Sequence, residues 1–437
     1  MLRLTLFLAT SALLRGQTPD YGGPSILSRG GPASSTGEAA NISFRPFLGV
    51  TAIYDTGLTA VTTNSSGDLQ RVGTLGIQGS AGIYGYHNFR HSVLGLDYRG
   101  DYQHYPRYSF ADGTNQMLTL GFSHKLSRRL TLNFNEAGGT YTRNYFFTGA
   151  SGVIDPLALN LPANDLFDNR VIYGQTSGGL TYQLSARLSF NITGAGYLVR
   201  RRSSSLYGVS GYTSGADFAY RVTRFVTVGM DYNFNHFDFT KAFGASDIHS
   251  GGGFISARLS RSIELSVSAG AARAETLFLG AVAIDPAIAA ITGQSSGIKA
   301  FYNVQYIPTG RVRLTRQWQR ANLEFHASQD VTPGNGVYLT SRGLDVGGAF
   351  SYSGLRHWNI GANVSYARLG ALAQNVGTYD GYQAGLGVTR DLSHGLQMIL
   401  RMDERRFATN YAGLNRTASQ VSLGFAWSPG DVPLKLW

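Results

Sequence analysis

Two side chains in one extended stretch have the types and spacing of a hydrolytic pair. His236 and Asp238 lie two residues apart within residues 226–239, where apolar and polar residues alternate. Both would therefore point to the same face of a strand, and a histidine beside a carboxylate can act as a general base. The sequence contains no GxSxG, HExxH or P-loop motif that would complete such a site. The pair supports a hydrolase only as a minor alternative, and we assign no catalytic residue.

Metal chemistry has equally little support in the sequence. The chain has no cysteine, so thiolate sites are excluded. Five of its nine histidines fall near short predicted turns and would be spread around a wide rim: His87, His91, His124, His357 and His394. We therefore predict no metal site and no cofactor.

The arginines follow the same short turns and give the chain a formal net charge of +11. They are dispersed along the sequence and do not cluster on one element: Arg90, Arg128, Arg129, Arg187, Arg224, Arg261, Arg316, Arg320 and Arg356. This dispersion argues against nucleic acid as a partner. The charge would favour anions in a channel only if it lined the channel wall.

The elements that must position these residues alternate with a period of two. Within residues 226–235, one parity is apolar: Val226, Val228, Met230, Tyr232 and Phe234. The other parity is small or polar: Thr227, Gly229, Asp231, Asn233 and Asn235. Each such strand has one apolar and one wet face. The wet faces contain Gly, Ser, Thr, Asn and Gln with few Lys or Glu, which suits a water-filled lumen.

The connections alternate between minimal turns and longer loops along residues 41–428. Long loops include residues 55–68, 147–168 and 279–297, whereas the intervening turns have only a few residues. This asymmetry is typical of membrane β-barrels, with the short turns in the periplasm and the long loops outside. We predict an all-β fold, a single transmembrane antiparallel barrel of about 16–18 strands, with 18 favoured. A barrel of that width leaves an aqueous channel.

The two ends of the chain have a different composition. Residues 1–16 form a predicted secretory signal peptide, with Arg3 before an apolar stretch at 4–14, and we place the cleavage after Gly16. Residues 17–40 are rich in Gly, Pro and Ser and are predicted to be irregular. Residues 429–437 form a C-terminal tail. The expected location is the bacterial outer membrane.

Candidate functional residues follow from the predicted barrel. The candidate pore-lining residues are Thr227, Asp231, Asn233, Arg401 and Asp403. Two long loops share the order Ile, Asp, Pro and apolar residues, at Asp155-Pro156 and at Asp285-Pro286. Asp before Pro suits an N-capped helical turn. One or both loops could fold inward and narrow the pore; the alternative is a pair of short external helices that pack on each other or on the rim.

The ends of the mature chain carry a family resemblance. Residues 21–30 (YGGPSILSRG) and 421–431 (VSLGFAWSPGD) resemble the corresponding segments of porin-like outer-membrane β-barrel proteins of bacteria. The resemblance implies export across the inner membrane and insertion by the barrel-assembly machinery, which recognises an aromatic-ended last strand. Phe425 and Trp427 fit that assembly signal. The chain continues to Trp437, which could serve as the aromatic terminus instead.

These observations lead to one favoured function and two alternatives. We expect a porin-like channel for the passive diffusion of small hydrophilic solutes. The first alternative is a non-conducting structural or surface-interaction barrel whose lumen is blocked by residues 17–40 or by the long loops, and the hydrolase is the second. Outer-membrane lipid and lipopolysaccharide are the expected surroundings. Arg200, Arg201 and Arg202 could contact lipopolysaccharide phosphates, but a solvated strand end is the favoured interpretation of these three residues. The oligomeric state stays open between monomer and trimer.

Overall fold

One antiparallel sheet accounts for almost all of the described chain. The computed structural model describes residues 41–58, 73–142, 170–372, 377–393, 395–410, 415–429 and 432–435. The first strands are β1 (Asn41–Asp55), β2 (Thr74–Asn88), β3 (Ser92–His104), β4 (Gly113–Lys125), β5 (Leu130–Tyr141), β6 (Val171–Gln183), β7 (Leu188–Arg201), β8 (Gly208–Arg221), β9 (Val226–Thr240) and β10 (Gly244–Arg258). The others are β11 (Ile263–Ala283), β12 (Ser296–Gln317), β13 (Ala321–Thr332), β14 (Ser341–Tyr352), β15 (Trp358–Ala371), β16 (Thr378–Ser393), β17 (Leu396–Thr409), β18 (Asn415–Trp427) and β19 (Val432–Lys435).

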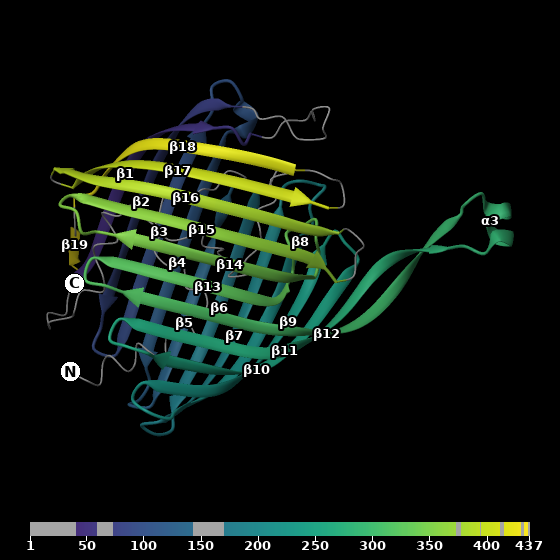
Figure 1. Ribbon diagram of the computed structural model, residues 1–437, viewed down its shortest axis with the longest axis horizontal. Helices are drawn as coiled ribbons and strands as arrows, with labels where there is room; N and C mark the ends of the chain where they lie inside the picture. Colours follow the sequence, from purple (N-terminus) through teal and green to yellow (C-terminus); the bar gives the residue numbers. More distant parts are fainter. Residues whose placement is uncertain are drawn as a thin grey trace.

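Strands β1 to β18 close into a barrel. Each strand pairs antiparallel with the next, and β1 pairs with β18 from Leu48↔Trp427 to Asp55↔Gln420 (Figure 1). A closed sheet leaves no free edge within the wall, which is the condition for β-structure in lipid. The predicted fold class and strand number are confirmed. No helix in the described part of the chain is long and apolar enough to cross a membrane.

A short strand extends the seam where the barrel closes. The pairing between β18 and β1 ends at Leu48, which leaves the first residues of β1 beyond the end of β18. Strand β19 pairs with them, from Asn41↔Lys435 to Phe44↔Val432. The segment predicted as a C-terminal tail therefore contains a strand that prolongs the seam.

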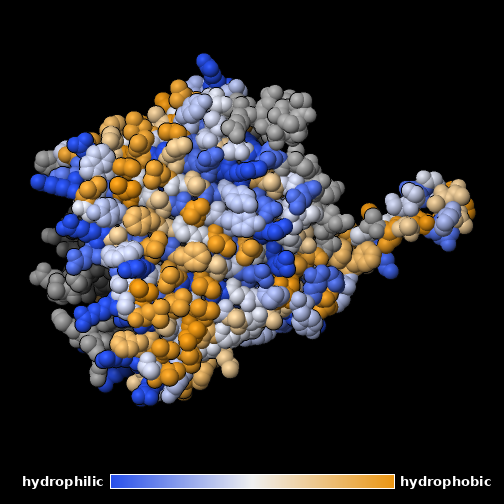
Figure 2. Space-filling model, in the orientation of Figure 1, coloured by the Kyte–Doolittle hydropathy of each residue, from blue (hydrophilic) through white to orange (hydrophobic). Residues whose placement is uncertain are grey.

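The two faces of the wall differ as the alternation predicts. Large apolar side chains point outward on every second residue, and Met230, Ile172 and Val50 are 72%, 64% and 62% exposed. Figure 2 shows an apolar band across the visible face of the barrel. Residues of the opposite parity, such as Asp231 and Asn233, line the inside. The outer band is the surface that an acyl-chain layer would cover.

The short turns that join the strands at one end share a local design. In four of them a hydroxyl accepts hydrogen bonds from the backbone N–H groups two and three residues later, at 3.1–3.2 Å; the acceptors are Ser127, Ser185, Thr223 and Ser260. Such side-chain caps favour tight turns. We call this the short-turn end and the opposite rim the long-loop end.

One hairpin extends beyond the long-loop end. Strands β11 and β12 have 21 and 22 residues, and α3 (Pro286–Thr292) lies at their tip. Strand β13 pairs with β12 only from Gly310 onward, and β10 pairs with β11 only as far as Phe278. Beyond these points the hairpin is a two-stranded arm that projects from the barrel (Figure 1). Pro308, which lacks an N–H group, lies next to the point where β12 leaves β13.

Candidate functional site

The inner face of the barrel is the candidate site, and β9 supplies three of the predicted pore-lining residues. Thr227, Asp231 and Asn233 alternate with the outward-facing residues of β9, and the register with β8 and β10 places all three on the inner face. Asn233 is exposed and donates a hydrogen bond from Nδ2 to Oδ2 of Asp231 at 3.2 Å. This wall therefore presents accessible amide and carboxylate groups to the lumen.

The other two predicted pore-lining residues form a buried ion pair on β17. Arg401 donates from Nε to Oδ2 of Asp403 at 2.5 Å and from its terminal nitrogen to Oδ1 at 2.6 Å, and the two side chains are only 8% and 3% exposed. Gly385 lies opposite Asp403 on β16, and a Cβ there would be 2.5 Å from Oδ1. The glycine makes room for the carboxylate. Both residues face inward, but this wall is much less accessible than β9.

Two further inward-facing arginines are also paired with neighbouring carboxylates. On β3, Arg99 donates to both oxygens of Asp97, at 2.9 and 2.6 Å. Across β12 and β13, Arg313 lies 2.9 Å from Glu324. Pairs of opposite sign neutralise each other locally, so these groups contribute little net charge to the lumen.

Four inward-facing carboxylates have no basic partner within ion-pair distance in the part of the chain that the structure describes: Asp101, Asp217, Asp231 and Asp330. Asp217 and Asp231 lie directly opposite each other on β8 and β9. Asp101 accepts a hydrogen bond from Asn115, at 2.7 Å. Like charges directly opposite on a sheet repel each other, so Asp217 and Asp231 create a local site of negative potential.

A short loop between β13 and β14 narrows the long-loop end of the lumen. Residues 333–340 are largely buried, with Asn335 and Tyr338 only 1% and 3% exposed. The ring of Tyr338 packs against Tyr379 on β16, with centroids 6.2 Å apart, in a buried cluster that includes Leu369 on β15 and Phe407 on β17.

The same loop contacts another part of the barrel mouth. The carbonyl of Gly336 accepts a hydrogen bond from the N–H of Tyr207, between β7 and β8, at 3.0 Å. Gly336 has a φ of 91°, and a Cβ there would lie 2.6 Å from Nε of Arg201, so the close approach requires glycine. Thr340 and Ser246 share a hydrogen bond of 2.5 Å. The loop thus contacts β7, β8 and β10 as well as β15 to β17.

An apolar collar surrounds this loop, and the sequence interpretation did not identify it. Tyr197, Val199, Val209, Phe237 and Ile248 are buried on the inner face at the long-loop end, and Leu339 of the loop packs against them. The signal was present in β9, where Phe237 has the same parity as Asn233 and Asn235. The lumen is therefore polar along most of β9 but apolar near its long-loop end.

Of the two loops predicted to constrict the pore, the structure describes only the one at Asp285-Pro286, and it is not part of this narrowing. Asp155 and Pro156 lie outside the described residues. Asp285 caps α3, since its side chain accepts from the N–H of Ala287 at 2.8 Å, and Pro286 is the first helical residue. Both belong to the tip of the arm, away from the barrel (Figure 1). The helical turn expected from Asp and Pro is present, and residues 333–340 narrow the lumen.

His236 and Asp238 lie on the outer surface near the long-loop end of β9. The Nε2 atom of His236 is 2.9 Å from Asp238, and its Nδ1 atom is 2.7 Å from Asp247 on β10. The ring stacks on Tyr212 with centroids 5.0 Å apart. Because a carboxylate engages each ring nitrogen, neither is left to accept a proton from a nucleophile as a hydrolytic base must.

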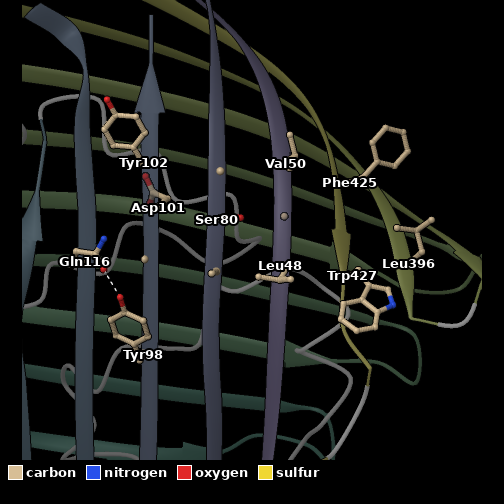
Figure 3. Close-up of a pocket in the computed structure, with 14 residues that line it drawn as sticks. Leu48, Val50, Ser80, Tyr98, Asp101, Tyr102, Gln116, Leu396, Phe425 and Trp427 are labelled. Carbon is tan, nitrogen blue, oxygen red and sulfur yellow. Dashed lines mark hydrogen bonds between the residues drawn. The ribbon is translucent and has the colours of Figure 1, made fainter. Parts of the chain in front are cut away.

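The residues of the predicted assembly signal lie on the outer face at the seam. Phe425 and Trp427 are 49% and 44% exposed on β18. They flank an apolar groove whose opposite wall includes Tyr98, which donates to Oε1 of Gln116 at 2.5 Å (Figure 3). Leu48 and Val50 lie between these walls. The groove belongs to the lipid-facing surface and not to the lumen.

Two of the histidines near the short turns are engaged by neighbouring side chains in the described part of the chain. His124 is hydrogen-bonded through Nδ1 to Ser92 at 2.6 Å, and His87 packs edge-on against Phe89. Within the described ranges no group of three potential ligands is close enough to hold a metal ion. His394 lies outside the described residues.

Comparison with known proteins returns bacterial outer-membrane channels at low similarity. No family model matches the sequence, and no curated protein matches it. Among solved structures, OccK5 (OpdH) of Pseudomonas aeruginosa is 12% identical over 90% of this chain and 98% of its own, with a TM-score of 0.44. OpdQ of the same organism has the same identity and coverage with a TM-score of 0.43. OccK2 (OpdF) in complex with glucuronate is 9% identical over 88% of this chain and 98% of its own, with a TM-score of 0.44. Sequence identities and TM-scores this low do not assign a function to the chain.

Proposed function

We propose that the protein is an outer-membrane channel for the passive diffusion of small hydrophilic solutes. The observation that carries the proposal is the combination of a closed barrel, an apolar outer band and polar side chains such as Asn233 that are accessible on the inner wall of β9. Eighteen tilted strands enclose more space than their own side chains fill. The protein would be exported through its predicted signal peptide and folded by the barrel-assembly machinery.

The charges on the β8–β9 side of the lumen support a preference for cations over anions there. Many of the arginines mark the short turns, and Arg99, Arg313 and Arg401 inside the barrel are ion-paired, but Arg311 faces the lumen from β12 without an ion pair in the described part of the chain. Along the inner wall of the described chain, Asp217 and Asp231 have no basic partner, whereas Arg401 is neutralised by Asp403. A solute in the lumen would therefore meet negative potential at β8 and β9.

A non-conducting barrel is the second candidate, and burial of the wall near the seam favours it. Gln397, Asp403, Arg416 and Gln420 face inward on β17 and β18, yet they are 1%, 2%, 4% and 6% exposed. A fully open channel would leave such residues accessible to water. The burial of these side chains supports either a pore that is restricted to the β8–β9 side or a blocked lumen.

Flux through vesicles distinguishes the two candidates. The mature protein, refolded into liposomes, is expected to allow neutral sugars up to a size limit to enter, measured as swelling. A variant without residues 17–40 is the companion, because the blocked-barrel hypothesis assigns the block to that segment or to the long loops. Swelling by the mature protein supports the channel; swelling only by the truncated variant supports the blocked barrel and refutes the open channel.

A further inference from the structure

The rim of the barrel at the short-turn end is strongly basic on its outer side. Exposed arginines occur in successive hairpin turns, among them Arg90, Arg187, Arg224, Arg261 and Arg356. The hairpin turns at this end, from β2–β3 to β16–β17, contain no aspartate or glutamate. In the described strands the carboxylates nearest to these turns have inward parity: Glu264, Glu324 and Asp391. The charged side chains on the outer side of this rim are therefore cationic in the part of the chain that the structure describes.

Three arginines of this rim lie over aromatic rings. The contacts, measured from the guanidinium carbon to the ring centroid, are Arg316 over Trp318 (4.5 Å), Arg224 over Phe225 (4.6 Å) and Arg390 over Trp358 (5.1 Å). The Trp318 and Phe225 side chains are 42% and 49% exposed. A cation over an aromatic face is attracted by the negative potential of the ring, so each contact orders a guanidinium group on the outer surface.

Two of these pairs lie where the apolar band ends. On β12, Leu314 and Arg316 share outward parity, and Arg316 is the nearer of the two to the turn. On β16, Leu386 is 51% exposed, and Arg390 faces outward opposite Trp358, four residues nearer the turn. Figure 2 shows hydrophilic residues along this rim beside the apolar band. Tryptophan next to arginine at such a boundary is typical of the level at which lipid headgroups begin.

The three ring-bound arginines have no carboxylate within ion-pair distance in the described ranges. Outward arginines at the long-loop end differ in this respect. Arg368 lies 3.5 Å from Asp380, and Arg273 pairs with Glu275. Cations at the short-turn rim are thus left for an anion from outside the chain, whereas these two at the other rim are neutralised within it.

We propose that the outer rim at the short-turn end binds the phosphate groups of phospholipids in the adjoining leaflet and prefers anionic lipids, such as phosphatidylglycerol, to zwitterionic ones. A guanidinium group matches a phosphate through two parallel hydrogen bonds. Headgroups surround a spanning barrel at this level, whereas a polymer beyond the turns would not reach outward side chains that adjoin the apolar band. The proposal requires a membrane-spanning barrel but not an open lumen.

Tryptophan quenching by brominated lipids tests the proposal, because Trp318 and Trp358 lie within the rim. The other two tryptophans of the chain, Trp427 and Trp437, are replaced by phenylalanine. The barrel is refolded in phosphatidylcholine vesicles that contain brominated phosphatidylglycerol or, at the same mole fraction, brominated phosphatidylcholine. We expect stronger quenching by phosphatidylglycerol. Arg316→Gln/Arg390→Gln should lower its relative association constant by about fivefold for each arginine. Equal quenching by the two lipids would overturn the proposal.

Arg406→Gln is the matched control, since Arg406 is exposed and faces outward on β17 toward the long-loop end. Heat-modifiable gel mobility checks that each variant is folded. The control should keep the full preference for phosphatidylglycerol; an equal loss in both variants would reduce the effect to net charge and contradict the proposal.

Two further outcomes would assign the rim to another anion. Inorganic phosphate that displaces phosphatidylglycerol at equal concentration would identify a site for the free anion. Sedimentation with purified peptidoglycan, lost in Arg316→Gln/Arg390→Gln and not accompanied by a lipid preference, would identify a cell-wall polymer. Either result would overturn the assignment to phospholipid.

Discussion

Removal of Arg401 should leave the buried carboxylate of Asp403 without its cationic partner on the inner wall. The Asp403 side chain is 3% exposed, and both of its oxygens accept hydrogen bonds from Arg401. Breaking a buried ion pair by deleting one partner costs about 3–5 kcal/mol, because the remaining charge is uncompensated. We therefore expect Arg401→Met to lower the free energy of unfolding by about that amount. Urea titration of the barrel in lipid vesicles, followed by tryptophan fluorescence, measures the change.

The double variant Arg401→Met/Asp403→Leu tests whether the uncompensated Asp403 carboxylate causes the loss of stability. Replacing a buried pair by apolar residues is often neutral, so most of the lost stability should return. Arg99→Leu is the matched control on β3, and its cost should be smaller because the Asp97 side chain is 24% exposed and can be hydrated. A loss below about 1 kcal/mol for Arg401→Met, as for an exposed pair, would refute the reasoning and show that water reaches this wall.

Three further predictions concern the lumen. Tyr338→Ala should loosen residues 333–340 and raise single-channel conductance; unchanged conductance would mean that the loop does not limit the flow. Asp217→Asn/Asp231→Asn should shift the reversal potential in a salt gradient toward anions, and an unchanged potential would remove these carboxylates from the selectivity argument. Gly385→Val should destabilise the barrel by about 1–3 kcal/mol, because its side chain would overlap Asp403; urea unfolding of a variant as stable as the parent would contradict that geometry.

The sequence was sufficient to predict the barrel because its signals are local. The alternation in β9 assigned Met230 to the outside and Asp231 to the inside, and the register confirms that assignment. The short turns were equally predictable, since residues such as Ser127 and Ser185 accept hydrogen bonds from backbone N–H groups only two residues later. A period of two and the contrast between turn lengths are thus properties of each hairpin by itself.

The course of the loops could not be predicted in the same way. Whether a loop folds inward depends on distant strands: Tyr338 packs against Tyr379 on β16, and Gly336 is hydrogen-bonded to Tyr207 between β7 and β8. The Asp285-Pro286 pattern correctly indicated a helical turn but contained no information about its position at the tip of the arm. The buried state of Asp403 likewise results from neighbours on other strands.

The full set of partners of His236 could not be predicted from the sequence alone. Residues two apart in a strand share a face, so the sequence predicted that His236 and Asp238 lie close together. Asp247 becomes the third member only through the register of β9 with β10, and it engages the remaining ring nitrogen. The spacing of His236 and Asp238 is typical of acid–base chemistry, but the two residues belong to a cluster of ionisable side chains on the outer surface.

Single-channel recording in a planar bilayer tests the central claim most directly. The mature protein, refolded and inserted under a salt gradient, is expected to give discrete, long-lived current steps with a reversal potential on the cation-selective side. Folded, heat-modifiable protein that inserts without producing current steps would contradict the diffusion channel and leave the non-conducting barrel in its place.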